Sequence, residues 1–294
     1  MPFDVKRVEK SARKVEGFLR KNSRHPSVAA IHSLRTNVRR LETMLLTFGL
    51  NSNPRDKRLL DELAIVRKCA GKVRDMDVLT SDVLTIKQPG EQDCLVELIE
   101  HLGAKRKKFA RKLHRCIDAE NARMGRDLKH KIRRLVRSVK EASARPDDSN
   151  IVPGTLAKIV SLYSELMKPV RLGRNNLHEY RLKVKELRNV LQLSNQTTDR
   201  KFLERLDEVK NTIGDWHDWE VLNAIAKEVL RHGISCGLMK YLQASTDSKY
   251  KRAQSLTQHL RHDFIRPRSV RTKDPSKFPQ TLSGFVSAIA EPRS

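Results

Sequence analysis

The sequence has few aromatic residues and no long apolar run. Phe, Trp and Tyr make up 5% of its 294 residues, with two tryptophans and four tyrosines. Binders of single-stranded nucleic acid stack bases on aromatic side chains, so this scarcity counts against that class. No stretch approaches the roughly 18 consecutive apolar residues that a membrane-spanning helix needs. We therefore expect a soluble protein without a membrane partner.

Cysteine is scarce, and the four thiols are far apart in the sequence. Cys69, Cys94, Cys116 and Cys236 include no Cys-x-x-Cys pair, the spacing typical of zinc or redox sites. We expect reduced thiols packed in a core. The first 24 residues alternate charged and apolar side chains and contain no apolar segment of the kind found in signal peptides. We therefore expect a cytoplasmic protein.

Signals for β-structure are also nearly absent, and helical periodicity dominates the chain. The predicted fold class is all-α. Breaks rich in Gly, Pro, Asn or Asp separate the expected helices. They fall at 22–26, 49–55, 88–92, 145–154, 171–176, 195–199 and 232–237. The break at 145–154 contains the densest cluster of turn residues, which predicts a boundary between two halves of the chain.

Positive charge is in large excess. Sixty Lys and Arg against 35 Asp and Glu give a net charge of +25 at pH 7. Such a charge causes self-repulsion in the folded state, and it indicates an anionic partner. Residues 101–145 hold 16 Lys and Arg but four Asp and Glu, close to half of the excess. Basic residues surround the predicted helix here, so some are ordinary solvated charges, whereas others, such as Lys108 and Arg111, extend the expected binding surface.

An amphipathic phrase with a basic edge occurs twice, 146 residues apart. Its apolar positions, spaced as on one helix face, are Ile31, Leu34, Val38, Leu41 and Leu45 in the first copy and Leu177, Tyr180, Val184, Leu187 and Leu191 in the second. One residue further on, rotated by roughly 100°, runs a row of cations. The rows are His32, Arg35 and Arg39, and His178, Arg181 and Lys185. A repeated order of cations beside the core stripe predicts a repeated anion-facing surface.

A second phrase follows each copy at an offset of 143 residues. It reads Gly71-Lys-Val-Arg74-Asp75 in the first half and Gly214-Asp-Trp-His217-Asp218 in the second. Two motifs in the same order, twice, indicate an internal duplication. We interpret Asp75, Asp77, Asp218 and Glu220 as carboxylates that pair with neighbouring cations, and Trp216 and Trp219 as helix-packing aromatics. Direct anion contact by Arg74 stays an alternative to a structural role.

The two His-x-x-Arg-x-x-x-Arg/Lys phrases and the two Gly-x-x-Arg/His-Asp phrases resemble the CHAD family, the conserved histidine α-helical domain. The resemblance covers roughly residues 25–262. It implies two similar helical bundles related by a pseudo-twofold, with a basic central groove or passage that binds inorganic polyphosphate. Departures from the family pattern occur at Glu42, where Arg is usual and the second half has Arg188, and in the substitution of His217 for Arg74.

The expected domain is 1–262, made of repeats at about 25–145 and 153–262, followed by an extended tail over 263–294 with a short helix near 282–289. The residues expected to bind polyphosphate share a basic side chain in or beside these motifs. They are His32, Arg35, Arg39, Arg40, Arg74, Lys108, Arg111, His178, Arg181, Lys185 and Arg188.

Motifs of phosphate-processing enzymes are missing. Some proteins with this domain resemble fusions to a triphosphate-processing barrel with Glu-x-Glu metal motifs, but no two glutamates here lie two residues apart, and no Gly-x-x-x-x-Gly-Lys-Ser/Thr loop occurs. His259 and His262 have a ligand-like spacing without a carboxylate or thiol cluster to complete a site. We expect no catalytic residue, metal or cofactor. The favoured interpretation is a polyphosphate binder recruited to polyphosphate granules; a nucleic-acid binder and, less favoured, an enzyme on phosphate compounds are the alternatives.

Overall fold

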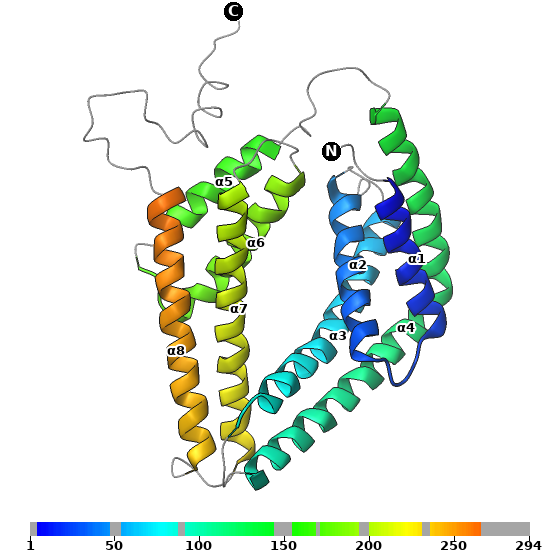
Figure 1. Ribbon diagram of the computed structural model, residues 1–294. Helices are drawn as coiled ribbons and strands as arrows, with labels where there is room; N and C mark the ends of the chain where they lie inside the picture. The colour runs from blue at the N-terminus through cyan, green and yellow to red at the C-terminus, as the bar shows by residue number, and fades with distance from the viewer. Residues whose placement is uncertain are drawn as a thin grey trace, which may run out of the picture. The chain divides into compact units, whose positions relative to one another are not determined.

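The computed structural model describes residues 5–47, 54–87, 92–143, 155–168, 171–193, 200–230 and 236–265, and within these ranges the regular structure is entirely helical (Figure 1). The predicted all-α class is confirmed. The elements in chain order are α1 (Val5–Lys21), α2 (Val28–Thr47), α3 (Pro54–Leu84), α4 (Gln92–Ser143), α5 (Thr155–Met167), α6 (Arg174–Leu193), α7 (Arg200–Val229), α8 (Gly237–Leu260) and a π-helical turn, η2 (Arg261–Ile265).

Each predicted break falls at the junction of two consecutive helices, and it contains residue types that disfavour the continuation of a helix. At the first break, 22–26, a residue of the turn contacts another helix. Asn22 has a φ of 32°, the left-handed conformation common after a helix end. Its carbonyl oxygen lies 2.9 Å from Nδ1 of His114 on α4, so the end of α1 is held against that helix. The predicted short helix at 282–289 lies outside the described residues.

The chain forms two compact units. Unit 1 comprises Met1–Asp148 with Val221–Leu242, and unit 2 comprises Ser149–Glu220 with Gln243–Ser294. The first boundary in the chain falls within the linker expected at 145–154. The second and third fall inside α7 and α8, so each of these helices contributes residues to both units.

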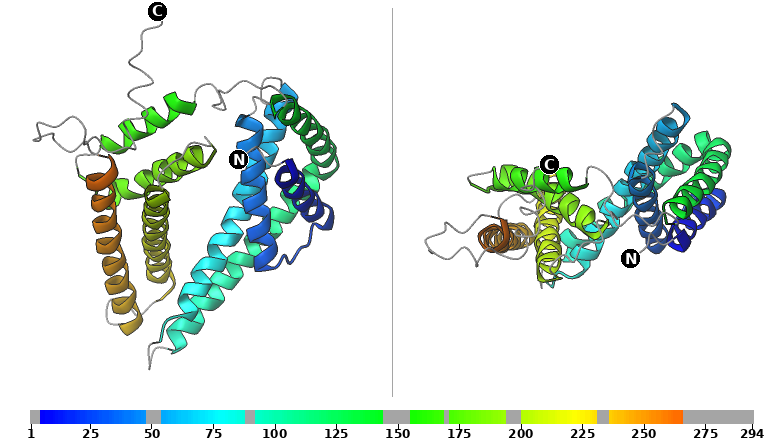
Figure 2. Two further views of the ribbon diagram at one scale, coloured as in Figure 1. Left: turned by 45° about the horizontal axis from the view of Figure 1, so that its top comes forward. Right: turned by 90° about the horizontal axis from the view of Figure 1, so that it is seen from above.

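The core of unit 1 is built around the apolar stripe of α2. The five predicted stripe residues, from Ile31 to Leu45, are each at most 2% exposed. They pack with Val15 and Leu19 of α1 and with apolar residues of α3 and α4. In both views of Figure 2, α3 and α4 run alongside each other, as their close packing requires. The predicted periodicity thus places α2 in the core of its bundle.

Unit 2 buries the corresponding stripe of α6. Its five residues, from Leu177 to Leu191, are at most 4% exposed and pack with residues of α5, α7 and α8. Trp216 is fully buried, with its ring centroid 5.6 Å from that of Tyr250, and Trp219 is 6% exposed. Both tryptophans are therefore packing residues, as interpreted. No helix in the described part of the chain is long and apolar enough to cross a membrane.

Candidate anion-binding surfaces

The cationic rows lie at the border between core and solvent. On α2, His32 is exposed, whereas Arg35 and Arg39 are partly buried. On α6, all three row residues, His178, Arg181 and Lys185, are partly buried. This placement follows from geometry, since a row rotated by roughly 100° from a buried stripe lies at the edge of the helix's buried face. The stems of the row cations are thus supported by neighbouring helices, which limits the entropy lost when a ligand is bound.

In each unit, one row arginine lies against the glycine of the second motif. In unit 1, a Cβ built on Gly71 of α3 would be 3.8 Å from Nε of Arg35. In unit 2, a Cβ built on Gly214 of α7 would be 2.8 Å from Nη2 of Arg181. These are corresponding positions of the two repeats. In unit 2 the glycine therefore does more than permit helix packing, because a side chain at this position would displace the guanidinium of Arg181.

Arg181 is further oriented by the backbone of α7. Its Nε donates a hydrogen bond to the carbonyl oxygen of Lys210 at 3.1 Å. A helix carbonyl normally accepts from the amide four residues later, so this oxygen has a second lone pair for the side chain. A guanidinium held through Nε keeps its planar fork in a defined direction, which is the arrangement suited to phosphate.

Two histidines meet in unit 2. The rings of His178 and His217 have centroids 4.3 Å apart at a tilt of 43°. Nδ1 of His178 is buried and has no hydrogen-bond partner among the residues that the structure describes. Burial, followed by the neighbouring His217 and Arg181, lowers the pKa of His178 below its ordinary value of 6.5. Unit 1 has Arg74 in place of His217, so the two repeats present different side chains at this position.

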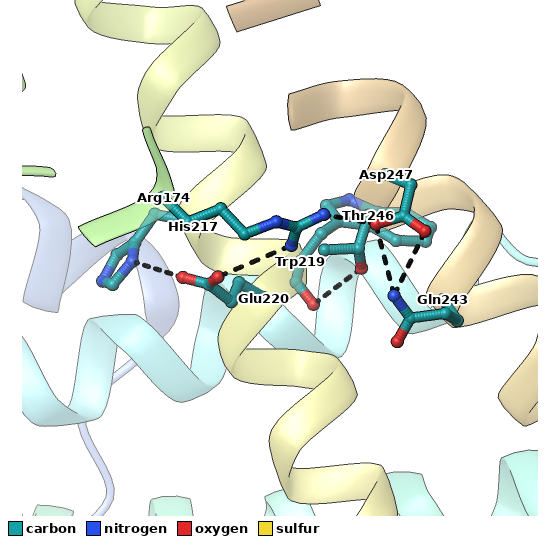
Figure 3. A network of polar contacts seen from close by, with 7 residues as sticks. All are labelled: Arg174, His217, Trp219, Glu220, Gln243, Thr246 and Asp247. Atoms are coloured by element: carbon teal, nitrogen blue, oxygen red, sulfur yellow. Dashed lines mark hydrogen bonds and ion pairs between the residues drawn. The ribbon is translucent and has the colours of Figure 1, made fainter. Parts of the chain in front are cut away.

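A polar network continues from His217 across α7, α6 and α8 (Figure 3). Glu220 lies 3.8 Å from Nδ1 of His217 and 3.9 Å from Nη1 of Arg174. Arg174 also pairs with Asp247, whose carboxylate accepts hydrogen bonds from Gln243 at 3.2 Å. Hydrogen bonds from Gln243 and Arg174 lower the pKa of Asp247. Arg174 is thus fixed between two carboxylates, next to the histidine pair.

Arg174, the central cation of this network, has no counterpart in the first repeat. The position 146 residues before Arg174 is Val28, so a comparison of the two copies could not reveal it. A usable signal was nevertheless present, since Arg174 precedes His178 by four residues and so lies on the same face of α6.

Glu42, which stands where the CHAD pattern usually has Arg, forms an ion pair. Oε2 of Glu42 lies 2.6 Å from Nε of Arg67 on α3. In unit 2, Arg188 lies 2.6 Å from Asp207 on α7, and Asp207 also pairs with Lys210, the counterpart of Arg67. In unit 1 the carboxylate is on α2 and the cation on α3, whereas in unit 2 the carboxylate is on α7 and a cation on α6. Each unit therefore has an ion pair that joins its two motif helices. Arg188, expected to bind phosphate, lies in this pair.

The pKa values of the two acids move in opposite directions. Burial raises the pKa of Glu42 despite the nearby Arg67. Burial would also raise the pKa of Asp207, but hydrogen bonds from Lys210 and Arg188 outweigh it and lower the pKa. Two cations around one carboxylate favour its charged form.

One acid of the second motif in each unit, Asp77 or Glu220, pairs with a cation. Asp77 is buried and accepts a 2.6 Å hydrogen bond from Nε of Arg106 on α4. Nη2 of Arg106 donates to the carbonyl oxygen of Pro26 at 3.0 Å, which ties α4 to the turn before α2. The interpretation of Asp77 and Glu220 as partners of neighbouring cations is confirmed. Arg106 is accordingly a structural cation within the basic stretch 101–145.

Four further predicted residues lie outside the rows. Arg40 on α2 and Lys108 and Arg111 on α4 are exposed, and Arg74 on α3 is partly buried. The two cationic rows belong to different units, and a groove shared by both rows stays a prediction. Among the described side chains, no group of three or more His, Cys, Asp or Glu is placed to hold a metal ion.

The fold and surface define an all-helical protein with cationic rows beside buried apolar stripes. The CHAD domain model matches residues 7–227, so the chain belongs to the CHAD domain family. A search of curated proteins finds no match. Among solved structures, the chain is similar to PptA from Streptomyces chartreusis, with a TM-score of 0.54 and 16% sequence identity over 85% of this chain and 99% of that one. At this identity the likeness supports the helical fold alone.

Proposed function

We propose that the protein binds inorganic polyphosphate through the two cationic rows and the side chains next to them. The observation that carries this proposal is the repeated placement of Arg35 on Gly71 and of Arg181 on Gly214. A contact that recurs at matching positions of both repeats is better explained by a shared ligand than by the needs of either core. Membership in the CHAD family supports the same ligand class.

The chemistry of the rows suits a linear phosphate polymer. Polyphosphate carries about one negative charge per monomer and has no bases, so it is recognised by the number and spacing of cations, as in contacts to a nucleic-acid backbone. An arginine donates two parallel N–H bonds to one phosphate, whereas lysine acts as a compact point charge. Rows that combine both cations along a helix provide successive contacts to a polymer.

We further propose that the protein is a binder without catalytic activity, acting in the cytoplasm and recruited to polyphosphate granules. Glu42, Asp77 and Glu220, three acids of the motif helices, are each engaged by cations. Carboxylates held in this way support the positions of basic side chains. This arrangement favours binding over metal-assisted hydrolysis, which needs carboxylates directed at a metal.

Duplex DNA is the second candidate, because a net charge of +25 attracts any polyanion. The test measures the affinity of the full chain for long-chain polyphosphate, heparin and duplex DNA at matched charge concentration and at two salt concentrations. We expect the tightest binding for polyphosphate at both salt concentrations. In the Arg35→Ala/Arg181→Ala double variant, this preference should disappear. Equal affinity of the unaltered protein for all three polymers would reduce the function to that of a general polycation.

A further inference from the structure

The four cysteines, far apart in the sequence, form two contacts in unit 1. The Sγ atoms of Cys69 on α3 and Cys116 on α4 are 3.2 Å apart. Those of Cys94 on α4 and Cys236, which precedes α8, are 3.7 Å apart. The paired residues are separated by 47 and 142 positions, so the pairs arise from helix packing and not from a short motif.

The two pairs differ in their access to solvent. Cys94 and Cys236 are 7% and 6% exposed, whereas Cys69 and Cys116 are both partly exposed. A small oxidant therefore reaches the Cys69–Cys116 pair more readily. Because an oxidant must reach the sulfur atom, we expect the Cys69–Cys116 pair to be oxidised before the Cys94–Cys236 pair.

The residues around Cys69 raise its pKa and so make its oxidation depend on pH. Burial, together with the neighbouring thiol of Cys116, raises the pKa of Cys69 to about 11, although Lys112 and Lys72 act in the opposite direction. Only a small fraction of Cys69 is therefore present as thiolate at neutral pH. Oxidation that starts at Cys69 is consequently slow near pH 7 and accelerates as the pH rises towards 9.

We propose that Cys69 and Cys116 form a reversible dithiol–disulfide site that takes a peroxide as its oxidant. One thiolate attacks a peroxide oxygen, the O–O bond breaks, and a sulfenic acid and water are formed. The second thiol attacks the sulfenic sulfur, an Sγ–Sγ bond forms, and a second water leaves. Two thiols and one hydrogen peroxide thus give one disulfide and two waters. A dithiol reductant reverses the reaction by thiol–disulfide exchange.

The disulfide would join α3 to α4 within unit 1. It would close a chain loop that includes the linker between these helices and part of both, and a closed loop restricts the unfolded chain. The oxidised protein should therefore melt at a higher temperature than the reduced protein. This inference does not depend on polyphosphate binding, and its tests do not use that ligand.

The experiment treats the full chain with hydrogen peroxide at pH 7 and pH 9, blocks remaining thiols, and digests the protein without reduction. Mass spectrometry should find a Cys69–Cys116 cross-linked peptide that forms faster at pH 9 and disappears with dithiothreitol. Cys116→Ser should abolish the cross-link, whereas the matched variant Cys236→Ser, which removes a thiol from the buried pair, should retain it. The melting temperature should rise by several degrees on oxidation, as the loop-closure entropy implies.

Three results would overturn the proposal. They are the absence of the cross-link at both pH values in the unaltered protein, the formation of a Cys94–Cys236 cross-link before it, and an irreversible sulfonic acid at Cys69 or Cys116 as the main product.

Discussion

The guanidinium of Arg181 lies on the backbone of Gly214. A Cβ built on this glycine would be 2.8 Å from Nη2 and 3.2 Å from Cζ of Arg181. The corresponding pair in unit 1 is looser, since a Cβ on Gly71 would be an ordinary 3.8 Å from Nε of Arg35. The two glycines occupy equivalent positions of the duplication, yet only in unit 2 does the arginine depend on the missing side chain.

Gly214→Ala should weaken polyphosphate binding without destabilising the fold. The atoms that the new methyl group meets belong to the end of a flexible side chain, so Arg181 can swing away from its position. Replacing Gly by Ala within a helix gains up to about 1 kcal/mol, which offsets the loss of contacts. We expect a loss of binding of about 1–3 kcal/mol, the range of a hydrogen bond to a charged group. Calorimetric titration and thermal melting measure the two effects.

Gly71→Ala is the matched control for this substitution. It adds the same methyl group at the equivalent position of unit 1, where the contact distance is ordinary. Its affinity should stay within about 0.5 kcal/mol of the unaltered protein, as for most substitutions that create no clash. Equal losses for the two glycine variants would show that the position of Arg181 on Gly214 is not specific to binding.

Helix periodicity accounts for most of the fold that the sequence predicts. Ile31, Leu34 and their repeats 146 residues later fall on one face, and that face is buried in both units. The ion pairs could not be predicted in this way. Glu42 meets Arg67, and Arg188 meets Asp207, across two helices whose relative rotation no single helix encodes. The periodicity of a helix shows which face is buried, whereas the partner of a border residue depends on how the neighbouring helix packs.

Arg35→Ala and Arg181→Ala should each reduce affinity for long-chain polyphosphate by about 1–3 kcal/mol. Both side chains are partly buried against a neighbouring helix, so their charges act in a medium of lower dielectric constant than water. Arg252→Ala, which removes an exposed arginine of α8 in unit 2, is the control and should cost less than about 0.5 kcal/mol. If all three variants lost the same affinity, net charge and not the rows would account for binding.

Glu220→Gln should strengthen binding. Its carboxylate lies beside His217 and Arg174, where it competes with phosphate for Arg174. Removing one negative charge there should gain about 1 kcal/mol, or roughly fivefold in affinity, from Coulomb interactions near the protein surface. The gain should be visible in an isothermal titration with long-chain polyphosphate.

The comparison variant is Glu179→Gln. It removes the same charge from an exposed side chain of α6 that pairs with Lys183. Its effect should be small because solvent and salt screen an exposed charge. A larger gain for Glu179→Gln than for Glu220→Gln would contradict the assignment of the histidine pair and Arg174 to the binding surface.

Polyphosphate affinity should increase as the pH falls from 7.5 towards 5.5, and His178 should account for part of this change. In the free protein the pKa of His178 is lowered, so the ring is neutral near pH 7. A bound phosphate favours the protonated ring and raises this pKa, so binding takes up a proton between the two values. His178→Gln should flatten the pH dependence of affinity, as measured by titration in buffers of constant ionic strength.

Protonation of His178 should also affect stability without ligand. Its folded pKa lies below the unfolded value of about 6.5, so the unfolded state binds the proton more readily and stability falls as the pH drops through this value. His259→Gln, an exposed substitution on α8, is the control for both measurements. A pH dependence that His178→Gln leaves unchanged would exclude this histidine as the titrating group.

The histidine pair and the cysteine pairs show what a linear motif search misses. His178 and His217 each belong to a sequence motif, but their contact follows from the packing of α6 on α7. Cys69 and Cys116 carried no motif at all, since their contact depends on the alignment of two long helices. Single-helix patterns are local, and both contacts join residues at least 39 positions apart.

The central claim is that many cations bind one polymer at the same time. A salt titration of the affinity for long-chain polyphosphate, with pyrophosphate as competitor, tests it most directly. Each neutralised phosphate contributes about 0.7 to the slope of log affinity against log salt in single-stranded nucleic acid, so six or more contacts predict a slope steeper than about −4. Pyrophosphate should compete poorly because it cannot make linked contacts along a row. A slope near −1, with efficient competition by pyrophosphate, would contradict the account and indicate a small-molecule site.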